Sequence, residues 1–366
     1  MRVGKKELLS QLLLRTGLAN VARWIHRDQM VIFNYHRLRR DERSGFTEFD
    51  SATFGPTQDQ FHGHMKWLKS NSQVLSEAEL LESVRTGRKL PPRSVMVTFD
   101  DGYSDNADLA VPILKDLGVP ALLFIPTGAI EQRQLGWWDL TAFVIKKTPL
   151  QTLQFRGESF DLGPAQDPRR AEVISRLHRM MKLQPHSRTE KLVAELSTAC
   201  RVALPDSEKS SQELMTWAQI REATGSGISI GSHTHTHRVL ATLDLEDQRQ
   251  ELVISKAILE EKLGQTIHSI AYPVGGYEHF HRETLGLAQS AGYELGFSYH
   301  TGVNSTESLN RFDIRRISAP DSIPLFSSSL ALPKLYSQRR CDQVAPAAYP
   351  LAHQPTVLSA PAETVQ

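Results

Sequence analysis

The run VMVTFDDGY, residues 95–103, indicates both the fold and the chemistry of this 366-residue chain. Its first half is apolar and β-branched, as in a strand that is buried on both faces. Two carboxylates, Asp100 and Asp101, follow at once and precede Gly102. Acidic residues at the end of such a strand lie where α/β barrel enzymes display their catalytic side chains. Helix N-capping is the structural alternative, because a helical pattern begins at Asp105.

Similar apolar runs recur along the chain and alternate with helical patterns, which predicts an α/β fold with a parallel sheet. The predicted strands are 31–35, 95–99, 121–125, 228–230, 267–272, 293–299 and 314–317. The clearest predicted helices are 58–69, 105–117 and 245–263. The last of them ends at Gly264, where a left-handed cap is expected.

The alternation of strands and helices divides the chain into a main domain and three further segments. An N-terminal amphipathic helical segment is predicted over 1–28, the main domain over 29–340, and an Ala/Pro-rich tail without fixed structure over 341–366. Within the main domain, about 150–214 reads as an insertion with a hairpin (LQFRGESFDL) and two polar helices. One of these helices opens with a Ser187-x-x-Glu190 capping box, and a Thr216-x-x-Gln219 box reopens the main pattern.

Composition argues against several classes of protein. The 42 basic and 41 acidic residues nearly cancel, so no overall field attracts nucleic acid. The two cysteines, Cys200 and Cys341, indicate neither a disulfide framework nor a thiolate zinc site. No secretory signal is recognised, and no apolar run reaches the roughly 18 residues of a spanning helix. We therefore expect a cytoplasmic protein.

The first 26 residues form a basic amphipathic pattern with Leu14, Leu18, Val21 and Ile25 on one stripe. Two interpretations are open for this segment. A helix packed on the protein body is favoured, and peripheral contact with a membrane surface is the alternative.

The run GSHTHTH, residues 231–237, places His233 and His237 four positions apart. Both side chains point to one side whether the segment is extended or helical, whereas His235 joins them only if it is extended. Two imidazoles and one carboxylate leave coordination positions open for water, which is typical of a catalytic metal site. Ordinary surface or core histidines are the alternative, and the acidic pair elsewhere in the chain favours the metal.

The segments TFDDGY, H-T-x-x-H and AYPVGGY (271–277) together resemble the polysaccharide deacetylase (NodB-homology) family over about residues 29–320. The resemblance implies a deformed (β/α) barrel of about seven parallel strands that removes acetyl groups from N-acetylated sugars or polysaccharides and releases acetate. It assigns the general base to Asp100 and a divalent metal to Asp101, His233 and His237. The ligand set suits zinc, with cobalt or nickel as alternatives.

The chain departs from the family pattern where many members carry Arg-x-Pro-Tyr. The corresponding residues here are Ala271, Tyr272, Pro273 and Val274, so the arginine that pairs with the base is missing. Arg316, in the segment DIRRIS, is the candidate replacement, with an ordinary surface charge as the alternative. We expect Tyr272, Pro273 and Val274 to contact the substrate, and a backbone N–H near Val274 to stabilise an oxyanion.

A histidine in an L-x-H motif is also not evident, and His36 at the end of IFNYH is the candidate general acid. The branch of the family that resembles exopolysaccharide deacetylases has this arrangement. The alternative is a histidine that only hydrogen-bonds to Asp100 or caps the barrel. Trp137 and Trp138 follow the third strand and are candidates to stack on a sugar, although buried aromatic residues are equally common.

Two other functions compete with a metal-dependent N-deacetylase. Two histidines and one carboxylate also describe the site of Fe(II) oxygenases, but Asp100 would then have no role. The missing motif arginine suggests a non-catalytic carbohydrate-binding homologue, but such a protein has no need for both aspartates and both histidines. An N-acetylated glycan is therefore the expected partner.

Overall fold

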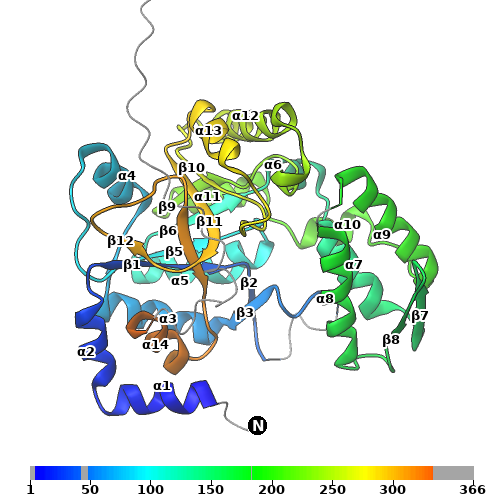
Figure 1. Ribbon diagram of the computed structural model, residues 1–366, viewed down its shortest axis with the longest axis horizontal. Helices are drawn as coiled ribbons and strands as arrows, with labels where there is room; N and C mark the ends of the chain where they lie inside the picture. The colour runs from blue at the N-terminus through cyan, green and yellow to red at the C-terminus, as the bar shows by residue number, and fades with distance from the viewer. Residues whose placement is uncertain (1–4, 43–47, 183, 333–366) are drawn as a thin grey trace, which may run out of the picture.

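Seven parallel strands close into a barrel in the computed structural model, which describes residues 5–42, 48–182 and 184–332 (Figure 1). These strands are β1 (Gln29–Tyr35), β5 (Ser94–Phe99), β6 (Ala121–Ile125), β9 (Ile228–Ser232), β10 (Ser269–Ala271), β11 (Leu295–Thr301) and β13 (Ile314–Ser318). Strand β1 pairs with both β5 and β13 and so closes the ring. The predicted α/β barrel is confirmed, and each of the seven predicted strands corresponds to one strand of the barrel.

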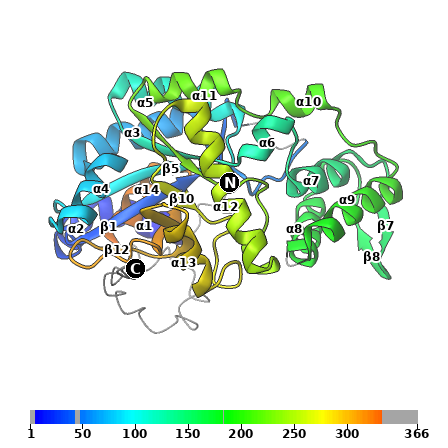
Figure 2. The same ribbon diagram turned by 90° about the horizontal axis from the view of Figure 1, so that it is seen from above.

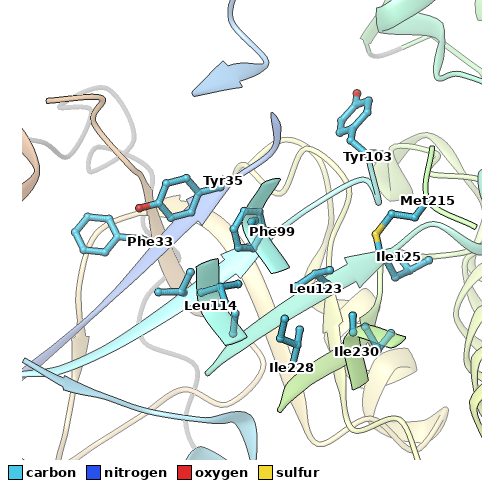
Figure 3. Close-up of a cluster of buried hydrophobic side chains, with 14 of the residues drawn as sticks. Phe33, Tyr35, Phe99, Tyr103, Leu114, Leu123, Ile125, Met215, Ile228 and Ile230 are labelled. Carbon is cyan, nitrogen blue, oxygen red and sulfur yellow. The ribbon is translucent and has the colours of Figure 1, made fainter. Parts of the chain in front are cut away.

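Alternate residues of β1, β5 and β6 enter two different apolar cores. Phe33 and its equivalents point outward against the helices, where they form the larger core (Figure 3). Ile32, Met96 and Phe124 belong to a second cluster inside the barrel. Because both faces are buried, the strands read as continuous apolar runs rather than as an alternating pattern.

Helices surround the barrel, as the two views show (Figures 1 and 2). They are α3 (Gln58–Asn71), α4 (Glu77–Thr86), α5 (Val111–Leu117), α6 (Thr127–Gln132), α11 (Trp217–Thr224), α12 (Leu245–Leu263), α13 (Arg282–Ser290) and α14 (Ile323–Ala331). Helix α12 ends at Gly264 with φ 65°, as predicted. The helix predicted at 105–117 instead begins with the π-helical turn η1 (Asn106–Ala110) and continues as α5.

Short strands extend the sheet at its margins. Strand β4 (Gln73–Val74) pairs with β5, and β12 (Asn304–Ser305) pairs antiparallel with β1. Strands β2 (Arg37–Arg39) and β3 (Phe54–Thr57) form a separate pair.

The insertion forms a lobe beside the barrel with an apolar core of its own. It contains α7 (Trp137–Lys147), β7 (Thr152–Phe155), β8 (Glu158–Asp161), α8 (Arg169–Lys182), α9 (His186–Cys200) and α10 (Ser207–Gln212). Because α7 contributes to this core, the lobe begins before residue 150. The hairpin is present, and the Thr216 capping box is confirmed. The Ser187 box is wrong, because Pro185 is the N-cap of α9 and Ser187 lies in its first turn.

Two helices precede the barrel, α1 (Lys5–Arg15) and α2 (Leu18–Ile25), with a break at Gly17, where φ is 74°. Both pack on α14. No helix in the described part of the chain is long and apolar enough to cross a membrane. The tail predicted at 341–366 lies outside the described residues.

Candidate metal centre and active site

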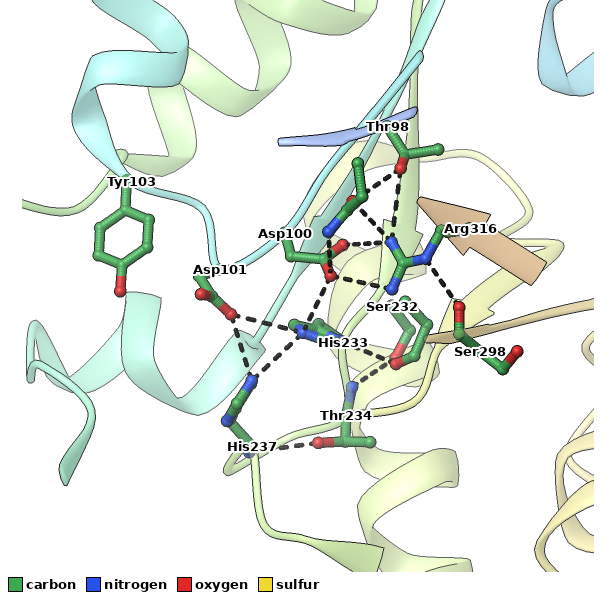
Figure 4. A network of polar contacts seen from close by, with 12 residues as sticks. Thr98, Asp100, Asp101, Tyr103, Ser232, His233, Thr234, His237, Ser298 and Arg316 are labelled. Carbon is green, nitrogen blue, oxygen red and sulfur yellow. Dashed lines mark hydrogen bonds and ion pairs between the residues drawn. The ribbon is translucent and has the colours of Figure 1, made fainter. Parts of the chain in front are cut away.

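A layer of polar side chains fills the carboxyl end of the barrel, above the apolar interior (Figure 4). Asn34, Thr98, Ser298 and Arg316 come from four different strands and are all buried. The Thr98 hydroxyl and Arg316 Nη1 both donate to Asn34 Oδ1, at 2.7 and 2.8 Å. Arg316 Nε donates to the carbonyl oxygen of Ser298 at 3.1 Å. These bonds fix the guanidinium in a site that excludes solvent.

Asp100 lies against this layer and forms a bidentate ion pair with Arg316. The Nη1–Oδ1 and Nη2–Oδ2 distances are 2.7 and 2.9 Å, and Asn34 Nδ2 donates to Oδ2 at 3.1 Å. Burial would raise the pKa of the Asp100 carboxyl, but the charge of Arg316, aided by His233 and His36, outweighs it and lowers the pKa. Asp100 is therefore ionised at neutral pH, and Arg316 is its buried partner rather than a surface charge.

Asp101 turns away from Arg316 toward two imidazoles (Figure 4). Its Oδ1 lies 3.4 Å from His233 Nε2 and 3.2 Å from His237 Nε2, and the two Nε2 atoms are 3.2 Å apart. All three residues are buried, and together they form a group that can hold a metal ion. Three ligands of a tetrahedral metal with bonds of about 2.1 Å are themselves about 3.4 Å apart. The observed spacing therefore fits one divalent cation.

The hydrogen bonds of the triad point to the same conclusion. His233 Nδ1 donates to the carbonyl oxygen of Ala271 at 2.8 Å, which leaves an Nε2 lone pair facing the centre. Asp101 Oδ1 is buried and has no hydrogen-bond partner among the described residues. Buried acceptor atoms that face one another need a cation between them, so the residues present fit a metal ion.

The ionisation of the triad follows from the same contacts. Burial would raise the pKa of Asp101, but the close imidazoles of His233 and His237 hold it well below its ordinary value. Burial lowers the pKa of His237, and the carboxylates only partly oppose this. At His233 burial is outweighed by the carboxylates of Asp100 and Asp101, which raise its pKa. An anionic aspartate and neutral imidazoles are the forms that bind metal, so metal binding at this site competes with protonation of His233.

Backbone strain concentrates in the three loops that carry the site. Asp101, Thr234, His237 and Val274 all have positive φ, at 74°, 63°, 55° and 60°. Such values are uncommon for residues other than glycine and cost most for a β-branched residue such as Val274. The surrounding structure therefore holds these loops in one unusual conformation, as functional loops often require.

His36 lies at the end of β1, half-buried and within electrostatic reach of Asp100 and Asp101. Its ring centroid is 6.2 Å from that of Tyr299. In the described part of the chain, the side-chain donors to the Asp100 carboxylate are Asn34 and Arg316. This pattern disfavours the alternative in which His36 serves only to hydrogen-bond with Asp100.

The residues that replace the missing motif separate into two groups. Pro273 and Val274 follow β10 in the loop beside Ala271, which anchors His233. The Tyr272 side chain lies in the core, 1% exposed, and its hydroxyl donates to the carbonyl oxygen of Phe312 at 3.1 Å. A side chain enclosed in this way cannot contact a sugar, so the expectation of a substrate contact at Tyr272 is not met.

Trp138 forms a wall beside the triad, with its ring centroid 4.3 Å from that of His237. Its indole N–H donates to the Tyr103 hydroxyl at 2.9 Å, and that hydroxyl donates to Asp139 at 2.7 Å. Trp137 instead contacts His178 of the insertion lobe, edge to face. The structure thus brings Trp138, but not Trp137, against a predicted metal ligand.

Asn34 and Tyr103 are site residues that the sequence did not reveal. The signal for Asn34 was a polar residue within an otherwise apolar strand, but its role depends on which strand lies opposite. Tyr103 lies two residues after Asp101. Its contacts with Trp138 and Asp139 depend on the tertiary structure and leave no signal in the sequence.

Comparisons with known proteins agree with this geometry. The profile of the polysaccharide deacetylase family matches residues 87–296. The Bacillus subtilis protein YxkH is 25% identical over 249 residues, which are 68% of this chain and 60% of that protein. A Staphylococcus aureus poly-β-1,6-N-acetyl-D-glucosamine N-deacetylase is 38% identical over 117 residues, 30% of this chain and 40% of that enzyme. The chain thus spans 60% and 40% of the length of these relatives, less than two thirds in each case.

Solved structures share the fold. The Streptococcus pyogenes deacetylase PplD, solved in complex with acetate, superposes with a TM-score of 0.53 at 19% identity, covering 85% of this chain and 98% of that one. IcaB from Ammonifex degensii gives a TM-score of 0.52 at 18% identity, with coverage of 83% and 97%. With the barrel, the buried triad and the family profile in agreement, the chain belongs to the polysaccharide deacetylase family.

Proposed function

We propose that this protein is a metal-dependent hydrolase that removes N-acetyl groups from an N-acetylated glycan and releases acetate. The observation that carries the proposal is a buried Asp–His–His triad with a second, ion-paired carboxylate directly beside it. Asp100 Oδ2 lies 3.9 Å from His233 Nε2, so base and metal ligands share one small site.

Asp101, His233 and His237 would hold the metal. A divalent cation bound there lowers the pKa of a water ligand and polarises the acetyl carbonyl. The triad leaves further coordination positions open, as a catalytic site requires. Zinc is the expected ion, and cobalt and nickel suit the same ligands.

The remaining residues divide the proton transfers between them. Asp100, held ionised by Arg316, accepts a proton from the water whose oxygen attacks the amide carbon. The backbone N–H near Val274 donates to the oxyanion that forms. His36 protonates the amine nitrogen as the C–N bond breaks, which leaves acetate and a free amino sugar. Trp138 packs beside the reacting group and limits the access of bulk water.

The substrate class follows from the family and from one relative. The Staphylococcus aureus enzyme is named for β-1,6-linked N-acetylglucosamine, which makes that polymer the first substrate to test. A paired, buried base beside the triad favours hydrolysis over Fe(II)-dependent oxygen chemistry, in which Asp100 has no task. It also opposes a non-catalytic role, because a buried ion pair is costly to keep without a use.

Acetate release from a panel of N-acetylated oligosaccharides tests the proposal. The panel contains β-1,6-linked and β-1,4-linked N-acetylglucosamine oligomers, each assayed with metal-stripped protein and after zinc, cobalt or nickel is restored. We expect release that depends on restored metal. An O-acetylated sugar serves as the control for general esterase activity.

Three outcomes would overturn the proposal. Binding of the oligomers without acetate release under any metal would indicate a carbohydrate-binding homologue. Iron-dependent oxygen uptake would indicate an oxygenase. Equal rates of acetate release with and without metal would show that the triad does not act as a catalytic metal site.

A further inference from the structure

The two N-terminal helices expose an unusual number of large apolar side chains. Among the described residues, seven such side chains are more than half exposed, and six of them lie on α1 and α2. We name these six the N-terminal apolar face: Leu8, Leu12, Leu18, Val21, Trp24 and Ile25. The seventh is Leu245, on α12.

These helices are anchored through their polar side chains. The Ser322 hydroxyl donates to the Glu7 carboxylate, and Ser328 Oγ donates to Ser10 Oγ at 2.7 Å. Arg23 is 6% exposed and donates to the carbonyl oxygen of Asn71, at the end of α3. Glu7, Ser10 and Arg23 thus face the protein, whereas the large apolar side chains of the N-terminal apolar face point outward, the reverse of a helix that packs its apolar stripe on a core.

Positive charge accompanies this apolar face. The N-terminal segment, residues 1–28, contains six basic residues and two acidic residues, although the whole chain has a formal net charge of only +1. Beside α2, Arg23, His26 and Arg93 line a hollow at the start of β1 and β5. Positive charge next to exposed leucine and tryptophan is the pattern of helices that lie in the headgroup region of an anionic bilayer.

We propose that the N-terminal apolar face binds the surface of an anionic lipid bilayer and so holds the barrel at a membrane. The charge favours lipid over a second copy of this chain, because two such basic faces repel each other. Trp24, 64% exposed, has the amphipathic ring that prefers the interface between headgroups and hydrocarbon. The proposal does not depend on the chemistry of the metal centre.

Vesicle flotation with the full-length protein tests the proposal. Vesicles of phosphatidylcholine alone are compared with vesicles that contain an equal share of phosphatidylglycerol. We expect the protein to float with the anionic vesicles and to be released by high salt. The double variant Leu12→Gln/Trp24→Gln should bind at least about tenfold more weakly, because two exposed anchors are lost.

The matched control is Leu245→Gln, which replaces a comparably exposed leucine on α12. Helix α12 lies at the opposite end of the molecule from α1 (Figure 1). It should float like the unaltered protein. Failure of the unaltered protein to float, or equal loss in the Leu245→Gln control, would overturn the proposal. A dimer in solution that the Leu12→Gln/Trp24→Gln variant dissociates would also overturn it, because a second copy would then cover the face. Vesicle binding that arises only after residues 341–366 are removed would do the same, because the C-terminal segment would then be the occupant.

Discussion

Asp100 and Asp101 are adjacent in sequence but occupy opposite electrostatic surroundings. Asp100 faces a buried guanidinium, whereas the positive φ of Asp101 turns its carboxylate toward two imidazoles. The proposed base and the proposed metal ligand are therefore adjacent residues whose side chains point in different directions. Sequence adjacency cannot assign these two roles, but the direction of each side chain can.

The His36→Ala variant separates a general acid from a structural histidine. If His36 delivers the proton to the amine, turnover should fall by roughly 10² to 10⁴ while metal content is unchanged. Substrates with better leaving groups should lose less. A loss of folding stability with normal turnover per folded molecule would contradict the assignment.

The Arg316→Met variant tests whether the ion pair tunes the base. Removal of the guanidinium leaves Asp100 buried without a partner, which should destabilise the fold by about 3–5 kcal/mol. The pKa of Asp100 should rise, because Arg316 is what lowers it against burial. The acidic limb of the rate profile should then move to higher pH, since more of the base is protonated at a given pH.

Arg315→Met is the matched control, because Arg315 lies on the same strand but does not pair with Asp100. If Arg316→Met does not fold, Arg316→Lys keeps a charge but loses the bidentate geometry, and a smaller shift in the same direction is expected. An unchanged profile in a folded Arg316 variant would show that Asp100 is not the titrating base.

The proposed metal ligands and the proposed base could be named from sequence because each lies in a short motif with fixed spacing. Arg316 could be proposed only as a candidate, and Asn34 not at all, because their roles depend on the order of the strands. Tyr272 shows the converse, since a position next to a motif does not reveal which face of the chain its side chain takes.

At the scale of elements, the seven barrel strands could be predicted because burial on both faces makes them apolar throughout. Closure of the ring could not, because β1 pairs with β5 and with β13, which are far from it and from each other in sequence. The two-residue strands β4 and β12 carry no periodic signal. The π-helical turn after Asp105 also escapes a prediction based on helical periodicity.

His64 joins α3 to α14 and should make that contact sensitive to acid. Its Nε2–H donates to the carbonyl oxygen of Asp321 at 2.9 Å, Tyr35 donates to Nδ1, and the ring stacks on Phe326. Burial lowers the pKa of His64 from 6.5 to about 4. Below pH 6.5 this imidazole is protonated in the unfolded chain but stays neutral in the folded protein. The free energy of unfolding therefore decreases as the pH drops toward 4.

Urea unfolding at neutral pH and at about pH 5 measures this effect. Between these values His64 should remove roughly 2 kcal/mol from the free energy of unfolding. His64→Gln should lose this part of the acid sensitivity, whereas His62→Gln on the same helix should keep it. Equal pH dependence in both variants would rule out His64 as the source.

Arg170 should hold the insertion lobe together. It is 1% exposed and donates to the carbonyl oxygens of Ile145, Thr148, Leu150 and Gly163 at 2.6, 3.0, 3.0 and 3.2 Å. Arg170→Met leaves several buried acceptors without donors, at about 1–3 kcal/mol each. In Arg170→Met, amide hydrogen exchange should become faster in α7 to α9 but not in the barrel. An equal increase in exchange rate across the whole molecule would contradict an independent lobe core.

At the scale of the whole molecule, the barrel, the lobe and the N-terminal helices have separable tasks. The barrel supplies the buried triad and the proposed base. The lobe reaches the site wall, where His178 contacts Trp137 and hydrogen-bonds to the carbonyl of Trp138 at 3.0 Å. The N-terminal helices lie away from the triad, so changes in lipid binding and in catalysis should be separable. A cytoplasmic location stays a prediction.

The central claim, one metal held by Asp101 and one base at Asp100, is tested most directly by measuring metal content and acetate release together in two variants. Asp100→Asn should keep its metal and lose roughly 10²-fold or more in rate, because no nearby group accepts the proton of water. Asp101→Asn should lose metal and activity together, and excess metal should restore part of the rate. The reverse pairing, in which Asp100→Asn loses the metal and Asp101→Asn retains it, would contradict the account.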